Sequence, residues 1–314
     1  MSHFAELMNR NRVARARQRK AANTVMLSLT GLLTALALVP LFWIIGYVVI
    51  RGGRNINLDF FIHMPTPMGV AGGGVLSAIE GTLVVTFLAA IFAIPPGVLA
   101  AFYAARYPNT PLGVALRFST DVLSGVPSIV VGLFAYAVIV VPMRHYSGLA
   151  GGAALAVLML PTIIRTTEEM LKLVPGTLRE ASLGLGAPEW KTSLSVLFPA
   201  ASSGIITGFL LALARASGET APLLMTALGN ERFDIAQIVR SGIQSHMNVF
   251  QVFWRIINQP VDSLPLALWK YAQQPYPERV EQAWTVALVL ILFVLTVNVT
   301  SRVWIQTRTR RVKG

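Results

Sequence analysis

Cysteine is absent from this 314-residue chain, and charged residues are scarce. Without cysteine the protein has no disulfide, thiol nucleophile or thiolate metal site. The four histidines lie far apart, without the spacing of metal ligands: His3, His63, His145 and His246. Charged residues make up 13% of the chain, whereas soluble domains average about 25%, and 54% of the residues are hydrophobic. These shortages exclude a soluble globular domain and predict an all-α, polytopic membrane protein.

The net charge of +12 is concentrated at the two ends of the chain. Six basic residues lie within positions 1–22 and five within positions 302–313. Basic tails beside membrane spans set the topology and bind anionic lipids. We therefore expect membrane lipids as partners and no nucleic acid. Residues 1–22 are predicted to be a basic cytoplasmic segment, and residues 307–314 a basic cytoplasmic tail.

The hydrophobic runs predict six transmembrane helices within residues 23–306. The expected spans are 23–50, 76–104, 114–141, 149–171, 203–228 and 282–304. The first apolar run is too long for a cleaved signal peptide, which favours an uncleaved signal anchor. Pro95 and Pro96 predict a kink or break in the second span, because each removes an amide donor. Gly125, Pro127 and Gly132 predict a broken third span, which a membrane tolerates beside a cavity or inside protein.

Six spans place both termini on one side of the membrane. If that side is the cytoplasm, 17 of the 26 Lys and Arg residues lie inside, eight lie outside, and Arg215 lies within the membrane. The positive-inside rule therefore favours cytoplasmic termini. The 175–200 loop is then cytoplasmic, and segment 229–281 is external. Trp254 and Trp269 in the external segment are typical of interfacial helices.

The predicted fifth span carries two charges, Arg215 and Glu219, which are expected to share one helix face. A charge at the centre of a lone membrane helix costs about 2.5–3.5 kcal/mol on insertion scales. Such residues face a bundle interior or a water-filled path, so the pair either lines an anion path or forms a buried ion pair that fixes the helix register. Gly204 and Gly208, on the same helix, form a small-xxx-small face for close helix packing.

A spaced pattern marks the polar loop at 175–200. It reads Glu180-Ala181-Ser182, then Gly186, then VLFP ending at Pro199. A short helix over about 176–184, followed by a glycine turn, predicts a compact knob. The pattern resembles the EAA loop of prokaryotic ABC importer permeases, which docks on the ATPase subunit. The resemblance implies that Glu180, Ala181, Ser182, Gly186 and Pro199 couple the chain to that ATPase.

The chain has no phosphate-binding P-loop of its own. The nearest approach, Gly186 to Thr192, carries Trp190 where a glycine precedes the lysine, and no strand comes before it. No Ser/His/Asp or metal-ligand cluster appears within the spans either. We therefore expect a non-catalytic chain that binds no cofactor, with ATP and magnesium used by the partner ATPase.

Two further stretches narrow the resemblance. LSGVPSIVVGLF (123–134) and ARASGETAPLL (214–224) are similar to signature segments of phosphate-specific ABC importer permeases. ETAP at 219–222 and LPL at 264–266 resemble the A-type subunit. The likeness covers about residues 75–300. It implies a type I ABC importer permease architecture, with a core at 75–304, the coupling loop at 175–200 and the external segment at 229–281.

The resemblance also implies a pathway and partners. Arg215 is the leading phosphate-pathway residue, because guanidinium offers fixed donors that stay charged, and Glu219 tunes it. Thr220, Ser124 and Ser128 supply hydroxyls, although the two serines fit packing at the helix break equally well. Arg165 is either an exit-gate residue or a lipid-facing, topological arginine. The implied partners are a homologous C-type permease, two ATPase subunits and an extracytoplasmic phosphate-binding protein, in the bacterial cytoplasmic membrane.

Two other functions stay open. Arginine alone does not discriminate between oxyanions, so molybdate or sulfate is an alternative substrate. An ion-coupled secondary transporter would need its own intramembrane coupling site. Only Glu219 and Asp121 are candidates for such a site, and the knob would have no role in that transporter.

Overall fold

The computed structural model describes residues 2–67, 70 and 72–313, and it describes side chains for 17–67, 70, 72–300 and 303. These residues are helical apart from loops and one isolated parallel bridge between Leu228 and Val261. The α-helices are α1 (Ser2–Gly52), α2 (Leu58–Ile62), α3 (Leu76–Arg106), α4 (Pro111–Gly125), α5 (Ser128–Ala135), α6 (Val141–Met143), α7 (Gly148–Lys172), α8 (Gly176–Gly184), α9 (Glu189–Thr192), α10 (Phe198–Ser217), α11 (Ala221–Thr226), α12 (Ile235–Gln244), α13 (Val249–Ile257), α14 (Leu264–Ala272) and α15 (Pro277–Lys313). One 3-10 turn (η1, Gly53–Asn55) and two π turns (η2, Tyr136–Val140; η3, Ser193–Leu197) complete them.

The described residues contain six stretches long and apolar enough to span a membrane, as predicted, when one bent helix pair is counted as a single span. Five are single apolar stretches of sufficient length, at 17–55, 76–106, 148–172, 189–217 and 277–300. The sixth is a pair of helices, 111–125 and 128–143, that meet at an angle of 106°. The predicted all-α fold with six spans is therefore confirmed, and the third span is broken as the sequence indicates.

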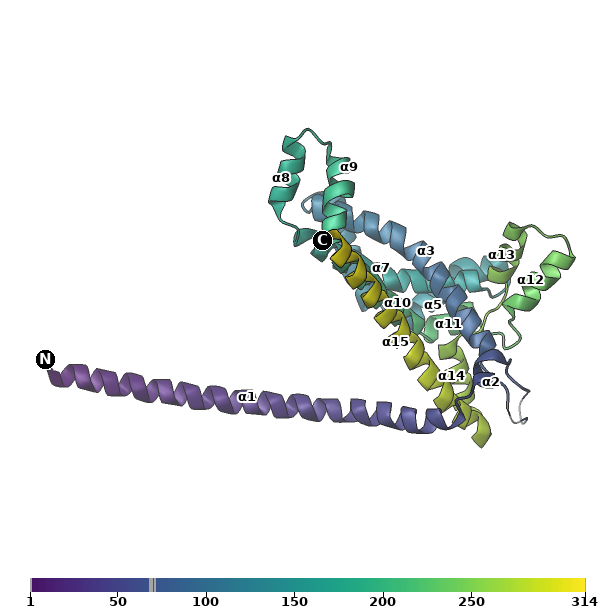
Figure 1. Ribbon diagram of the computed structural model, residues 1–314, viewed down its shortest axis with the longest axis horizontal. Helices are drawn as coiled ribbons and strands as arrows, with labels where there is room; N and C mark the ends of the chain where they lie inside the picture. The colour runs from purple at the N-terminus through teal and green to yellow at the C-terminus, as the bar shows by residue number, and fades with distance from the viewer. Residues whose placement is uncertain (1, 68–69, 71, 314) are drawn as a thin grey trace.

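The first helix leaves the bundle and extends far from it, as Figure 1 shows. Its last turns are attached to α15: the rings of Tyr47 and Trp284 lie 4.9 Å apart, and Arg51 pairs with Glu281. Gly52 lies so close to Trp284 that a Cβ there would be 2.5 Å from its carbonyl oxygen. The helix is continuous across position 22, and α15 is likewise continuous across position 306. Thus α1 is held by one end, and most of its apolar surface is exposed.

Helices α3 and α7 pack together at the centre of the bundle. Small residues on α3 face inwards at intervals of four, including the fully buried Ala89, Ala93 and Ala101. Gly97 continues this stripe, since a Cβ there would lie 2.8 Å from a methyl carbon of Ile163. Of the kink or break predicted at Pro95 and Pro96, the break does not occur, because α3 runs through both prolines. This packing against α7 stabilises the helix where two amide donors are missing.

Close packing of α10 on α7 depends on the two predicted glycines. A Cβ at Gly204 would lie 2.1 Å from the sulfur of Met170, and one at Gly208 would lie 2.1 Å from Oγ1 of Thr166. Real Cβ atoms do not approach so closely, so a larger side chain at Gly204 would displace the flexible Met170 side chain, and one at Gly208 would collide with the branched Thr166. The small-xxx-small face predicted for this helix is confirmed.

Substituting Gly208 by valine should separate α10 from α7. The added side chain meets Thr166 at its Cβ (2.7 Å) as well as its hydroxyl, and overpacking of this kind costs about 1–3 kcal/mol. We expect lower membrane abundance and a lower Tm of the purified complex. Gly31→Val makes the same change in α1, where nothing lies within 4 Å, and should leave both unchanged. Equal abundance and Tm for the two variants would contradict the packing role.

The break in the third span has a local cause. Thr110 caps α4 by accepting a hydrogen bond from Gly113 N (3.2 Å), and Pro111 fits the first helical turn. At the other end Val126 is extended, as residues before a proline usually are, and Pro127 precedes α5. Helix α5 then packs on α11, where a Cβ at Gly132 would lie 2.6 Å from Cα of Pro222. The broken third span therefore meets the segment that follows Arg215.

The 229–281 segment folds into α12, α13 and α14 and then the start of α15. Asn248 and Gln251 form a reciprocal capping box that begins α13. Val249, Phe250 and Trp254 on this helix are exposed, as expected of an amphipathic interfacial helix. The α12–α13 hairpin stands away from the main bundle in Figure 1.

A buried ion pair lies within this segment, beside its contact with α3. Asp262 is 1% exposed and lies 3.5 Å from Nζ of Lys270. Burial raises the pKa of the Asp262 carboxyl, and Lys270 opposes that effect. A Cβ at Gly81 would lie 2.0 Å from the Asp262 carbonyl oxygen, so α3 approaches this turn with no intervening side chain.

Candidate functional site

A cavity of about 200 Å³ lies between α4, α7 and α10, and Arg215 is one of its lining residues. We call it the Arg215 cavity. Its polar lining comes from hydroxyls, two arginines and one carboxylate: Thr120, Ser124, Thr162, Thr166, Arg165, Arg215 and Glu169. The two arginines outnumber the one carboxylate and lie among hydroxyl donors, which favours binding of an anion. Three residues predicted to lie on the pathway, Arg215, Arg165 and Ser124, thus share one cavity.

Arg215 lies in the last turn of α10, where a cation complements the partial negative charge of the helix end. The expected uninterrupted helix over 203–228 is wrong, because α10 ends at Ser217 and α11 begins at Ala221. Glu219 therefore lies in the link between two helices and not on the helix face of Arg215. Gly218 caps α10, and Pro222 occupies the first turn of α11, where it lacks only an unused donor.

The contact between Arg215 and Glu219 is long. Nε of the arginine lies 3.8 Å from Oε1 of the glutamate, beyond hydrogen-bond distance. The arginine side chain is 57% exposed and the glutamate side chain 19%. The carboxylate therefore offsets part of the charge, while the guanidinium donors stay open to a ligand.

Of the other predicted pathway residues, two line this cavity and two do not. Ser124 donates a hydrogen bond to the Asp121 carbonyl (2.7 Å), and Arg165 pairs with the Asp121 carboxylate at 3.2 Å. Ser128 begins α5 and Thr220 precedes α11, and neither lines the cavity. These last two belong to the neighbouring layer in which α5 packs on α11.

A second cavity, of about 180 Å³, adjoins the first along α4 and α7. We call it the Lys172 cavity; the two cavities share Thr120, Arg165 and Glu169. Its remaining lining residues are charged: Arg117, Asp121, Glu168 and Lys172. The two cavities together form a polar track from the end of α10 towards the end of α7.

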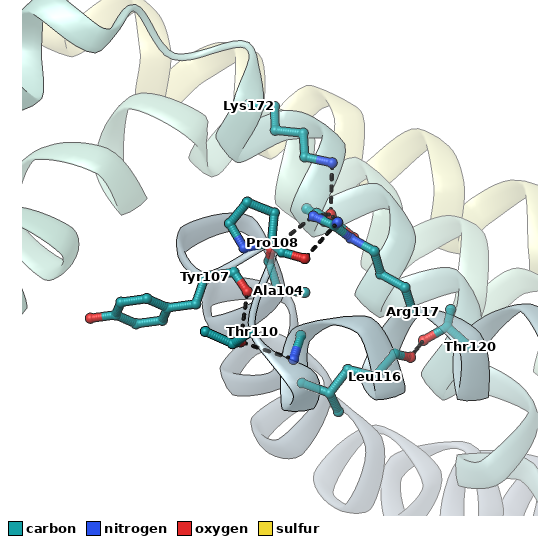
Figure 2. Close-up of polar contacts among 10 residues, drawn as sticks. Ala104, Tyr107, Pro108, Thr110, Leu116, Arg117, Thr120 and Lys172 are labelled. Atoms are coloured by element: carbon teal, nitrogen blue, oxygen red, sulfur yellow. Dashed lines mark hydrogen bonds and ion pairs between the residues drawn. The ribbon is translucent and has the colours of Figure 1, made fainter.

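Glu168 is a buried carboxylate at the far end of this track. Oε1 accepts a hydrogen bond from Nε of Arg117 (2.7 Å) and lies 2.7 Å from Nζ of Lys172. Figure 2 shows Arg117 also directed at the end of α3 and the turn that follows it, where it donates to the carbonyls of Ala104 (2.9 Å) and Pro108 (3.4 Å). The arginine thus fastens the α3–α4 turn to α7 immediately before the coupling loop.

The charged residues of α7 other than Arg165 were missed by sequence reasoning. Arg165, Glu168, Glu169 and Lys172 follow one another at helical spacing in the stretch RTTEEMLK. Residues three and four apart lie on the same helix face. This spacing near the end of a membrane span could have indicated the charged face of α7. The same spacing is equally typical of an ordinary solvated helix end.

The predicted knob protrudes from the bundle (Figure 1) and consists of α8, α9 and the turn between them. Helix α8 spans Gly176–Gly184, which confirms the predicted helix over about 176–184, and Gly186 follows with φ of +81°. Ser182 shares a hydrogen bond with Thr192 (2.9 Å), so this residue holds α8 to the α9 side of the knob. Leu185 (89%) and Trp190 (67%) are strongly exposed.

Glu189 anchors the knob at its base. One carboxylate oxygen lies 2.5 Å from an Nη atom of both Arg106, at the end of α3, and Arg179, on α8. Beside it lies a cavity of about 140 Å³ whose lining includes Arg106, Arg179 and Lys172. The knob is therefore connected to the same end of α3 and α7 that the Arg117–Glu168 contact holds.

Residues 97–314 match the family described as binding-protein-dependent transport system inner membrane component. The chain belongs to this family. It is 39% identical over 305 residues to the phosphate transport system permease protein PstA of Yersinia pestis, covering 96% of both chains. It is 42% identical to PstA of Xylella fastidiosa (strain 9a5c), covering 81% of this chain and 82% of that one. With PstA 1 of Mycobacterium tuberculosis H37Rv the identity is 34%, over 94% and 92%.

Solved structures show the same fold at lower sequence identity. Two inward-facing crystal forms of the MetNI methionine ABC transporter match with TM-scores of 0.51 and 0.52 at 18% identity. Each match covers 74% of this chain and 94% of the other. The type I ABC importer permease architecture expected from the sequence is therefore confirmed, and the chain is a non-catalytic membrane component.

Proposed function

We propose that this chain is the permease subunit of an ATP-driven phosphate importer and that phosphate passes along the track containing Arg215. The observation that carries the proposal is the meeting of Arg215, Arg165 and Ser124 on one cavity, in a chain related to PstA permeases over nearly its whole length. Phosphate is an anion at neutral pH, and guanidinium groups bind its oxygens with fixed, planar donors.

The charges along the track fit transient binding. Conduction requires binding that is favourable enough to admit the ion and weak enough to release it. Each cation on the track has a carboxylate neighbour: Glu219 for Arg215, Asp121 for Arg165, and Glu168 for Arg117 and Lys172. These carboxylates lower the cost of placing cations in the membrane and prevent any one site from trapping phosphate.

The knob is proposed to carry the coupling to ATP hydrolysis. In this arrangement both termini and α8–α9 are cytoplasmic, and the α12–α14 segment faces the binding protein outside. Two ATPase subunits receive the knobs of this chain and of a homologous C-type permease. Closure of the ATPase pair moves α8, and the contacts of Glu189 with Arg106 and Arg179 pass that movement to α3. Glu180, Ala181 and Pro199 are exposed and available to the ATPase.

The alternatives are less well supported. Another oxyanion would satisfy the same arginines, but the relatives at 34–42% identity are phosphate permeases. A secondary transporter would need a carboxylate site for its coupling ion. Of the two candidates, Asp121 pairs with Arg165 and Glu219 lies beside Arg215, so each is next to a fixed cation that opposes cation binding.

Uptake of radiolabelled phosphate tests the function directly. Cells without their own phosphate importers would express the complete operon, or the operon without its ATPase gene. We expect uptake only from the complete operon, with excess unlabelled molybdate or sulfate failing to compete. Uptake without the ATPase would overturn the ABC importer assignment. Competition by another oxyanion would instead reassign the substrate.

A further inference from the structure

Three carboxylates line the two cavities of the track, and they differ in their partners. Asp121 pairs with Arg165 (3.2 Å), and Glu168 pairs with both Arg117 and Lys172. Glu169 is exposed and lines both cavities, yet among the described side chains it has neither an ion pair nor a hydrogen bond. An unpaired carboxylate beside two arginines is unexpected in a path for anions, because it repels the ligand that the arginines attract.

Helix geometry sets Glu169 beside Arg165. The two residues are four apart on α7 and therefore lie on one face. Both residues and Arg215 line the Arg215 cavity. An oxyanion bound by the arginines would thus have a carboxylate among its neighbours, together with the hydroxyls of Thr162 and Thr166.

We infer that Glu169 accepts a hydrogen bond from the P–OH group of the bound anion and so selects protonated oxyanions. Inorganic phosphate keeps at least one O–H group at neutral pH, whereas sulfate has none. An ionised carboxylate accepts hydrogen bonds only, so it stabilises phosphate and repels sulfate. The inference rests on the proposed function. It places a second selection for phosphate inside the membrane path, after the selection made by the binding protein.

One cysteine introduced into the cavity provides the assay. The chain has no native cysteine, so Thr162→Cys creates a unique thiol whose alkylation by N-ethylmaleimide can be followed by mass spectrometry. Thr162 lines the Arg215 cavity and makes no side-chain hydrogen bond among the described residues. The purified complex of this chain with its partner permease and ATPases would be labelled in phosphate, sulfate or chloride at equal ionic strength.

With Glu169 intact, phosphate should slow alkylation at about tenfold lower concentration than sulfate, a ratio that corresponds to about 1.4 kcal/mol. Glu169→Gln can donate through its amide, so sulfate should then protect nearly as well as phosphate. Glu169→Asp keeps the acceptor and should keep part of the preference. Glu278→Gln, at the exposed start of α15, is the matched control and should behave like the parent.

The outcomes separate this inference from the proposed function. One outcome is that phosphate protects the Thr162→Cys thiol from alkylation, but Glu169→Gln leaves the preference for phosphate over sulfate unchanged. This would refute the role of Glu169 and leave the proposed phosphate path intact. If phosphate gives no protection even with Glu169 intact, the cavity is not on the phosphate path, and both proposals fail.

Discussion

Arg215→Gln should abolish phosphate uptake, leaving only the background of cells without an importer. The substitution keeps the length and polarity of the side chain but removes the charge and the planar fork that bind oxyanions. The arginine side chain is 57% exposed and makes no hydrogen bond to Glu219. Its removal should therefore weaken phosphate binding more than it destabilises the fold. Radiolabelled phosphate uptake from the complete operon is the measurement, with membrane abundance and ATPase co-purification checked in parallel.

Two further variants make the result specific. Arg54→Gln removes an exposed arginine from η1, outside the track, and should transport normally. Arg215→Lys keeps the charge without the fork and should retain part of the uptake, because ammonium binds phosphate as a point charge. Normal uptake with Arg215→Gln would show that the arginine is structural, although the fold and the family would be unaffected. Loss of the protein from the membrane would point to a register-fixing ion pair instead.

The six spans and the coupling loop could be predicted because their signals are local. Long apolar runs define the spans, and Pro127 with its flanking glycines marks the break between α4 and α5. Gly186 predicted a turn because glycine readily adopts a positive φ, and its φ is +81° in the structure. Gly204 and Gly208 predicted the packing face of α10, because two glycines four residues apart leave a helix surface that a neighbouring helix can approach closely.

The errors arose where tertiary packing decides the outcome. Pro95 and Pro96 predict a kink or break, but α3 does not break because it packs along its length on α7 through residues such as Gly97 and Ile163. Arg215 and Glu219 fit one helix by spacing, yet α11 turns away to pack against α5 at Gly132 and Pro222. The sequence contains no record of these distant partners.

The site was only partly predictable for the same reason. Arg215 is conspicuous because its neighbours in the chain are apolar, so charge alone identifies it. Glu169 lies in a polar stretch beside Glu168, and nothing in the sequence separates the two carboxylates. Only the structure shows that Glu168 pairs with Arg117 and Lys172, while Glu169 has no ion pair among the described residues and lines both cavities.

Substituting Gly186 by valine should uncouple ATP hydrolysis from transport. Its φ of +81° is unfavourable for a β-branched residue, and a position of this kind costs about 1–3 kcal/mol. No atom lies within 4 Å of a Cβ built there, so the effect would come from the backbone alone. We expect the turn to rearrange, displacing the exposed Leu185 from its position on the knob, and uptake to fall by about tenfold or more, since 1.4 kcal/mol corresponds to a factor of ten.

Gly184→Val is the matched control, because this glycine is two residues away, lies in the last turn of α8, and also has open space around a Cβ. It has ordinary helical backbone, so the same side chain should be tolerated there. Uptake and ATPase co-purification measured on both variants distinguish a docking knob from a passive connection. If both variants transport normally, the conformation of the turn is irrelevant to coupling. If both fail equally, the exposed surface of α8 and not the turn at Gly186 makes the contact with the ATPase.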